Sequence, residues 1–474
     1  MKVTSISFSQ DLSQAYIYVE NTGVRAVKIL RVTINSEDIT SFSEIMGGTL
    51  EPKDKTVIVV KPEGGFKRGE KVRFKIESEV SAAEAEIRVF PAVFPVGIYG
   101  GSVVVSDRDS ALEVIEMGLD TIVAGVNDLD AAQKYGFKVI AYAPRAKDSV
   151  DLDLESIEKF KEHPSLLAWY VIDEPDIWEI RGVVPEGWTA RWSEEVKRID
   201  KRNPTYIVLC NPWIFERFAK IPDVLAIDPY PVTWGPLTHV TFMAEKAVAA
   251  ASPSPVWLIP QAFRHGRPPR KGRWGWNRFP SPQEERIMVF MGLSHGLKGV
   301  IYFTFGSWID NPDDPVEGVS STHLDAILLR RAVARMSGEL HSLGPILALA
   351  DVVTGNRSWI SWSRTGSIEV GSVLSGNRAV ILFAINHNYV SREEGFKIDP
   401  AKNVIIETRV PGWFDIKDTF LLDQQGLRDI KMERFDNKIV FKLPEIETTS
   451  TIILARDENL RSRIEDEWSR WRRY

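Results

Sequence analysis

The chain has 474 residues, of which 44% are hydrophobic and 26% are charged. At roughly 150 residues per domain this length predicts about three domains, and the composition excludes a disordered or collagen-like chain. The 59 Lys and Arg residues against 65 Asp and Glu residues give a net charge of -6, so we expect no nucleic-acid partner.

Targeting and redox signals are few. The single cysteine, Cys210, excludes a disulfide within the chain. The first residues alternate like a strand and lack the apolar core of a signal peptide, and no segment approaches the ~18 apolar residues of a membrane span. We therefore expect a cytoplasmic protein with no membrane partner. One cysteine and many charged residues are compatible with a thermophilic source.

Residues 1–94 alternate between apolar and polar side chains over short segments separated by turn residues. This pattern predicts an N-terminal all-β sandwich, in which we see no catalytic chemistry. The expected strands are Val3–Phe8, Gln14–Val19, Val27–Ile34, Lys55–Lys61, Val72–Glu77 and Glu84–Phe90.

Residues 95–345 alternate eight times between a short apolar strand and a helical segment. Eight such units in about 250 residues predict a (β/α)8 barrel, and the alternative is an open doubly wound sheet with additional units. No Gly-rich phosphate loop follows any of the strands, which weakens that alternative. The expected strands are Val96–Gly100, Asp120–Ala124, Lys138–Ala143, Ala168–Asp173, Tyr206–Cys210, Val224–Asp228, Val256–Pro260 and Gly299–Phe303; the expected helices include Asp109–Met117, Leu154–Glu162, Ser193–Asp200, Phe242–Ala251, Pro282–His295 and Leu324–Leu343.

The segment 346–456 returns to alternating strands and predicts a C-terminal all-β sandwich. Its expected strands include Ala379–Asn386, Val404–Val410, Lys438–Leu443 and Thr449–Leu454. Residues 457–474 are rich in charge and carry Ile464, Trp468 and Trp471 at helical spacing, which predicts a helix with one apolar stripe. This helix either packs on its own chain, forms a homo-oligomer contact, or extends as an exposed tail.

Catalytic groups of (β/α)8 enzymes lie at the carboxyl ends of the strands. The fourth expected strand ends in Asp173-Glu174-Pro175, and the sixth ends in Asp228 followed by Tyr230. Adjacent carboxylates raise the pKa of at least one of them, as a general acid requires. The alternative is that the Asp173–Glu174 pair only caps the next helix or meets an arginine such as Arg181.

Aromatic and amide side chains surround the same expected mouth, where flat aromatic faces suit the C–H faces of sugar rings. We expect a carbohydrate substrate, with these residues lining its site: Tyr99, Tyr230, Trp234, Gln261, Tyr302 and Trp308. Trp213, Trp274 and Trp276 also fall near strand ends. The basic segment Arg264–Arg273 favours an acidic sugar as a minority alternative.

The barrel segment resembles a glycoside hydrolase barrel of the clan A type, through Asp173-Glu-Pro, Asp228-Pro-Tyr-Pro, Pro260-Gln-Ala-Phe and Tyr302-Phe-Thr-Phe-Gly-Ser-Trp. The resemblance implies that Glu174 is the acid/base of a glycosidase, and we expect its substrate to be a β-linked sugar or short oligosaccharide. Clan A places an asparagine at position 173 and a nucleophilic glutamate on strand seven, where this chain has Gln261. The Asp173–Glu174 pair is also similar to that of family 20 and 123 hexosaminidases.

Three mechanisms remain open. In the first, Glu174 is the acid and Asp173 orients a substrate N-acetyl group that attacks its own anomeric carbon. In the second, Asp228 or Asp310 supplies the second carboxylate. In the third, the barrel is a non-catalytic carbohydrate-binding or assembly protein. The seven histidines form no metal-ligand spacing, so we expect no metal and no cofactor; Cys210 is expected to be a small buried side chain.

Overall fold

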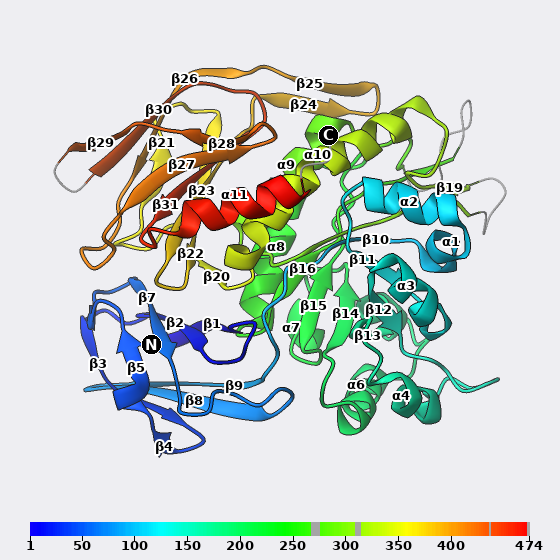
Figure 1. Ribbon diagram of the computed structural model, residues 1–474, viewed down its shortest axis with the longest axis horizontal. Coiled ribbons are helices and arrows are strands. Elements are labelled where there is room, and N and C mark those ends of the chain that lie inside the picture. The colour runs from blue at the N-terminus through cyan, green and yellow to red at the C-terminus, as the bar shows by residue number, and fades with distance from the viewer. Residues whose placement is uncertain (267–274, 309–313, 436–437, 472–474) are drawn as a thin grey trace.

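The computed structural model describes residues 1–266, 275–308, 314–435 and 438–471. Eight parallel strands form a closed barrel, which confirms the predicted fold class; in Figure 1 the barrel and its helices lie to the right of the two β-rich regions. The strands follow one another around the barrel in chain order, and the last pairs with the first. They are β10 Val96–Tyr99, β11 Thr121–Ala124, β12 Lys138–Tyr142, β13 Leu166–Ile172, β14 Thr205–Leu209, β15 Val224–Ile227, β16 Val256–Leu258 and β18 Val300–Tyr302.

Alternate residues of each barrel strand face opposite sides, because side chains in a strand alternate with a period of two. On β13, Ala168 and Tyr170 belong to the core cluster inside the barrel, whereas Trp169 and Val171 pack in the layer between strands and helices. Large interior side chains fill the barrel, among them Tyr206 and Trp257. The barrel interior is therefore a packed core, and only its mouth has room for a ligand.

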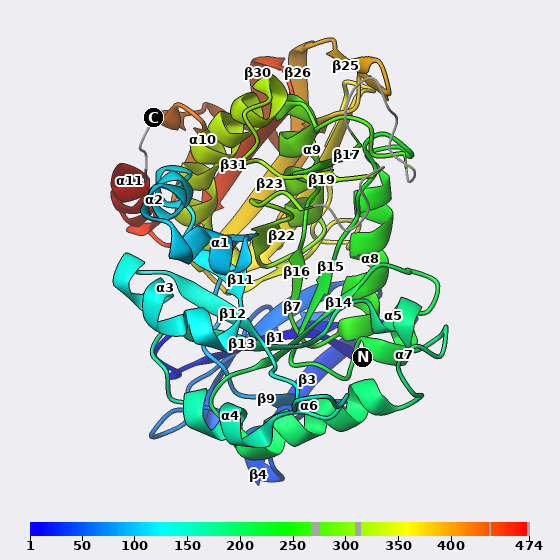
Figure 2. The same cartoon turned by 90° about the vertical axis from the view of Figure 1, so that its right-hand side faces the viewer.

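Helices surround the barrel (Figure 2). They agree with the expected helical segments to within a few residues, except that α6 begins five residues before the expected Ser193. Their bounds are α1 Gly101–Ser106, α2 Arg108–Glu116, α3 Leu129–Tyr135, α4 Leu154–Phe160, α5 Pro175–Trp178, α6 Trp188–Ile199, α7 Phe215–Phe218, α8 His239–Ala251, α9 Pro282–Ser294 and α10 Leu324–Leu347. No helix in the described ranges has the length and apolar character that a membrane crossing requires.

The N-terminal segment forms two antiparallel sheets that share one apolar core. One sheet has the order β1-β2-β7-β5, and the other is built around β4-β3-β8-β9 with β6 paired to β3. The strands are β1 Lys2–Phe8, β2 Ala15–Glu20, β3 Val27–Ile34, β4 Glu37–Asp38, β5 Ser43–Ile45, β6 Thr49–Leu50, β7 Lys55–Val60, β8 Lys71–Ser78 and β9 Ala82–Arg88.

The C-terminal segment also forms two antiparallel sheets, of orders β20-β22-β23-β31-β27-β28 and β21-β26-β30-β29, with a separate hairpin β24-β25. Its strands are β20 Ala350–Val352, β21 Ser361–Ser363, β22 Ile368–Ser375, β23 Ala379–Asn386, β24 Tyr389–Arg392, β25 Gly395–Ile398, β26 Ala401–Thr408, β27 Asp418–Asp423, β28 Gly426–Asp429, β29 Met432–Phe435, β30 Lys438–Ile446 and β31 Thr449–Ala455. Two short strands at the barrel mouth, β17 Arg264–His265 and β19 Val316–Glu317, pair with each other.

The predicted C-terminal helix is α11, Leu460–Trp471, and it packs along α10 of its own chain (Figure 1). Its apolar stripe of Leu460, Ile464 and Trp468 is buried. Gly338 of α10 permits this contact, because a Cβ there would lie 3.1 Å from the Trp468 ring. The stripe is thus used within the chain, and a homo-oligomer contact through this helix stays a prediction.

Glu285 is a buried carboxyl group whose burial is not compensated by any hydrogen bond among the described residues. Glu285 of α9 is fully buried, and neither of its carboxylate oxygens has a hydrogen-bond partner among the described residues. Burial and the charge of Glu284 raise the pKa of Glu285 well above its usual range. The folded chain therefore favours the protonated form of this carboxyl group up to a higher pH than the unfolded chain does.

We expect Glu285→Gln to raise the free energy of unfolding at pH 8 by roughly 1–3 kcal/mol. Between the unfolded pKa of Glu, about 4.3, and the raised folded pKa, the folded chain binds more protons, so its stability falls as pH rises. The amide removes this dependence. Urea unfolding at pH 4 and pH 8 checks it, with the exposed Glu116→Gln as control; an equal effect of Glu285→Gln at both pH values would contradict it.

Candidate active site

A cavity of about 770 Å³ opens at the carboxyl ends of the barrel strands. Its walls include Asp173 and Glu174 after β13, Cys210 after β14, and Asp228 and Tyr230 after β15. Two of these positions follow from the alternation along their strands. Tyr206 and Val208 face the barrel interior, as do Val224 and Ala226, so Cys210 and Asp228 continue the interior face by two residues.

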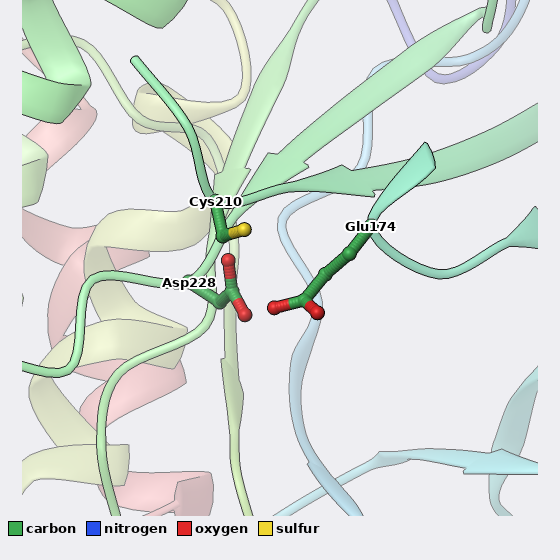
Figure 3. Close-up of side chains that lie close together, drawn as sticks. All are labelled: Glu174, Cys210 and Asp228. Atoms are coloured by element: carbon green, nitrogen blue, oxygen red, sulfur yellow. The ribbon is translucent and has the colours of Figure 1, made fainter. Parts of the chain in front are cut away.

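Three side chains converge in this cavity: Glu174, Cys210 and Asp228 (Figure 3). One carboxylate oxygen of each acid and the Cys210 sulfur all lie within 4.8 Å of one another. They come from the fourth, fifth and sixth strands of the barrel, so closure of the sheet brings them together. The thiol of Cys210 is only partly buried and faces the two acids, unlike the buried packing residue that we expected.

Glu174 occupies a strained turn. Its backbone has φ 41° and ψ 53°, the left-handed region that non-glycine residues seldom adopt. Such strain is concentrated at functional sites. The side chain makes no capping hydrogen bond to α5, and no arginine, Arg181 included, is among the described residues that line the cavity with it. The structural alternatives to a functional acid pair therefore receive no support.

Asp173 lies beside Glu174 and accepts a hydrogen bond from the Tyr170 hydroxyl. Burial, followed by the neighbouring charge of Glu174, raises the pKa of Asp173 to about 6. Tyr170 itself is part of the packed barrel interior and stacks on Tyr142, with ring centroids 4.9 Å apart. The hydrogen bond from Tyr170 therefore fixes Asp173 to the barrel core, and Asp173 lines the cavity.

Asp176 positions the end of the neighbouring strand. Its buried carboxylate accepts hydrogen bonds from the backbone N–H groups of Cys210, at 2.9 Å, and Asn211, at 2.6 Å. Burial nevertheless raises the pKa of Asp176 to about 7. Our sequence analysis overlooked this residue, although it stands two positions after Glu174. The sequence feature that could have indicated it is a third acid in the motif Asp173-Glu174-Pro175-Asp176 at the end of this strand.

The surroundings of Asp228 favour its protonated form. Burial and the nearby carboxylates of Glu174, Asp173 and Asp176 raise its pKa well above the usual range. Its Oδ1 atom has no hydrogen-bond partner in the described ranges. Since no described Lys or Arg side chain lines the cavity, nothing there compensates a charged Asp228. The site thus pairs an acid whose protonated form is favoured with a second carboxylate, as acid–base chemistry requires.

The same three side chains are the group in the described ranges that has a spacing suited to a metal ion. Two carboxylates and a thiolate are a donor set that Zn²⁺ accepts. Burial and the neighbouring acids raise the pKa of the Cys210 thiol, so an ion would have to displace its proton. Activity measured with EDTA and after addition of Zn²⁺ would distinguish a metal centre from a pair of catalytic acids.

Aromatic side chains form much of the remaining wall. Four residues expected to line the sugar site do line the cavity: Tyr99, Tyr230, Trp234 and Trp308. The sequence analysis missed or did not select several others, namely Trp178, Trp213, Phe263, Trp276 and Phe303. Tyr230 anchors this wall, with ring centroids 5.0 Å from Phe263 and 5.8 Å from Phe303.

Two residues expected in the site do not line this cavity. Tyr302 is fully buried on the outer face of β18, in the layer between strands and helices. Because Ile301 faces the barrel interior, alternation directs Tyr302 outward and brings Phe303 to the cavity. Gln261 is also fully buried: its amide accepts a hydrogen bond from Val232 N–H at 3.0 Å and donates to the Val232 carbonyl. It holds the loop after β15 in place.

Other expectations concern the loops of the mouth. Arg264, at the start of the basic segment, is buried and paired with Glu317, at 2.8 Å between Nη2 and the carboxylate. It is therefore engaged in structure. Asp310, Trp274 and the remaining basic residues from 267 to 273 lie outside the described residues.

No known family model matches the sequence, and no curated protein matches it. A cycloisomaltooligosaccharide glucanotransferase from Paenibacillus sp., in complex with cycloisomaltoheptaose, is similar at 8% identity and a TM-score of 0.49, over 96% of this chain and 99% of that one. An alpha-L-fucosidase isoenzyme 2 from Paenibacillus thiaminolyticus is similar at 9% identity and a TM-score of 0.47, over 73% of this chain and 96% of that one. A beta-D-glucuronidase from Dictyoglomus thermophilum is similar at 14% identity and a TM-score of 0.36, over 70% of this chain and 68% of that one. Likenesses this distant carry no argument about activity.

Proposed function

We propose that this chain is a retaining glycoside hydrolase for a β-linked sugar, with Glu174 and Asp228 as its two catalytic carboxylates. The observation that supports it best is their separation: one oxygen of each lies within 4.8 Å of the other. Retaining enzymes hold the two carboxyl groups about 5–5.5 Å apart, whereas inverting enzymes leave about 6.5–9.5 Å for a water molecule. The aromatic wall provides stacking surfaces for sugar rings.

The raised pKa of Asp228 favours a reversal of the roles that the sequence resemblance implied. In our proposal, Asp228 protonates the glycosidic oxygen while the Glu174 carboxylate attacks the anomeric carbon and forms a glycosyl ester. Asp228, now ionised, then removes a proton from the water that hydrolyses this ester, which restores both groups. Glu174 is suited to attack because it extends into the cavity and lies next to the acid (Figure 3).

Asp173 is a positioning residue in this proposal. Its carboxylate lies on the cavity wall next to Glu174 and is held by Tyr170. It can accept a hydrogen bond from a substrate hydroxyl, or from the N–H of a 2-acetamido group. The second possibility retains the hexosaminidase-like mechanism, in which the substrate itself supplies the nucleophile.

The test is a panel of 4-nitrophenyl β-glycosides with and without a 2-acetamido group, with the anomeric form of the first product followed by NMR. Cleavage of plain glycosides with retention supports the proposal. Cleavage of acetamido sugars alone would transfer the nucleophilic role to the substrate. Loss of activity in EDTA that added Zn²⁺ restores would indicate a metal centre. If no glycoside is cleaved, the proposal fails, and the non-catalytic carbohydrate-binding protein takes its place.

A further inference from the structure

Among the described residues, the exposed tryptophans all lie at the cavity of the candidate active site. Trp178, Trp213 and Trp234 have exposed fractions of 39%, 76% and 53%, and these are the exposed tryptophans among the described residues. All three line the cavity that contains Glu174 and Asp228. Large aromatic side chains left in contact with water in a group indicate a binding surface, because their burial by a ligand is favourable.

Two of these tryptophans belong to a continuous aromatic strip, which we define as Trp234, His239, Phe242 and Trp213. Ring centroids lie 5.2 Å apart from Trp234 to His239, 6.2 Å from His239 to Phe242, and 5.5 Å from Phe242 to Trp213. The strip thus extends from the loop after β15, across the first turn of α8, to the loop after β14.

The composition of the strip favours a neutral ligand with flat apolar faces. His239 is half-buried, and burial lowers its pKa below the usual value, so its ring is uncharged at neutral pH. The strip contains no carboxylate, and a neighbouring lysine, Lys246, holds its Nζ atom 6.0 Å from the centre of the Phe242 ring. Successive rings along such a surface match successive pyranose units of a chain, each of which presents a C–H face on an otherwise polar molecule.

We infer that the aromatic strip binds an oligosaccharide chain beyond the bond that is cleaved, so that the substrate is a polymer or long oligosaccharide and not a simple glycoside. This inference rests on the proposed function for the cleavage step, but the binding of the chain can be measured without it. The cavity of about 770 Å³ lies in the upper part of the roughly 300–1,000 Å³ range of ligand pockets.

The experiment uses soluble cello-, xylo-, manno- and chito-oligosaccharides from disaccharide to hexasaccharide, together with the 4-nitrophenyl monoglycosides. Affinity is measured by calorimetry and kcat/KM by product analysis. For wild type, we expect both to increase with chain length in one of the series. Trp213→Ala should lower affinity and kcat/KM for the hexasaccharide by about threefold to tenfold, and should lower kcat/KM for the monoglycosides by a smaller factor.

A matched control is Trp362→Ala. Trp362 is a partly exposed tryptophan on β21 of the C-terminal sandwich and belongs to neither the strip nor the cavity wall. This variant should behave like wild type towards all substrates. Since the Trp213 side chain is 76% exposed, its removal should leave the melting temperature unchanged, which excludes misfolding as a cause.

The outcomes separate the two proposals. Hydrolysis of monoglycosides without any effect of chain length, or an equal loss in Trp213→Ala for short and long substrates, would overturn the strip inference and leave the hydrolase proposal intact. Binding that grows with chain length and is lost in Trp213→Ala, without any cleavage, would support the strip and overturn the hydrolase. If no oligosaccharide binds, the strip inference is wrong.

Discussion

Glu174→Gln should lower kcat by at least about 10³-fold on every substrate, including aryl glycosides with good leaving groups. The amide keeps the size of the side chain but cannot attack the anomeric carbon, so no glycosyl ester forms. The loss should remain with every leaving group, because a better leaving group does not replace the missing nucleophile. Steady-state kinetics with 4-nitrophenyl and 2,4-dinitrophenyl glycosides measure this.

The same variant should be at least as stable as wild type, since it removes one of several like charges around Asp228. The control is Glu186→Gln, whose carboxylate is 83% exposed on the loop before α6, and which should retain full activity. Adding azide to Glu174→Ala should restore turnover and yield a glycosyl azide of inverted configuration. Near-normal turnover of Glu174→Gln would remove this residue from the mechanism.

Asp228→Asn should lower kcat by about 10²–10⁴-fold for substrates with poor leaving groups, and far less for dinitrophenyl glycosides, which leave without protonation. The reason is that the amide cannot donate the proton that burial keeps on Asp228. Wild-type activity should fall as pH rises through the raised pKa of this acid, because only its protonated form can act. This alkaline decrease should be absent from Asp228→Asn when dinitrophenyl substrates are used.

Azide distinguishes this assignment from the one that the sequence resemblance implied. If Asp228 is the acid/base, Asp228→Ala with azide should give a glycosyl azide of retained configuration, because Glu174 still forms the ester. An inverted azide, together with loss of dinitrophenyl hydrolysis, would make Asp228 the nucleophile and return the acid role to Glu174. The carboxylate pair would then remain, with its roles exchanged.

Local patterns were sufficient for the architecture. The short apolar segments of β13 and β18, and the helical spacing of α10 and α11, depend on residues close in sequence, so the elements of the barrel and both sandwich regions could be predicted before any tertiary contact was known. The same is true of the Asp173–Glu174 pair, because a strand end in a barrel places its polar residues at the mouth.

Side-chain direction at the mouth was harder to predict, since it depends on where each strand enters the closed barrel. A shift of one residue exchanges the inner and outer faces of a strand. We selected Tyr302, which faces the helices, although its neighbour Phe303 reaches the cavity. Gln261 follows the seventh barrel strand, where ligand-binding residues are expected, but its side-chain amide already hydrogen-bonds to the backbone N–H and carbonyl of Val232.

The contacts between distant segments required the closed barrel. Glu174 and Asp228 are 54 residues apart in the sequence, yet they meet because their strands are separated by a single strand, β14, whose own end supplies Cys210. Burial and the charges of these acids raise the pKa of Asp228 above its usual range. Periodicity along the chain specifies which residues lie on one face of a strand, whereas the distance and electrostatic coupling between two strand ends arise only when the sheet closes.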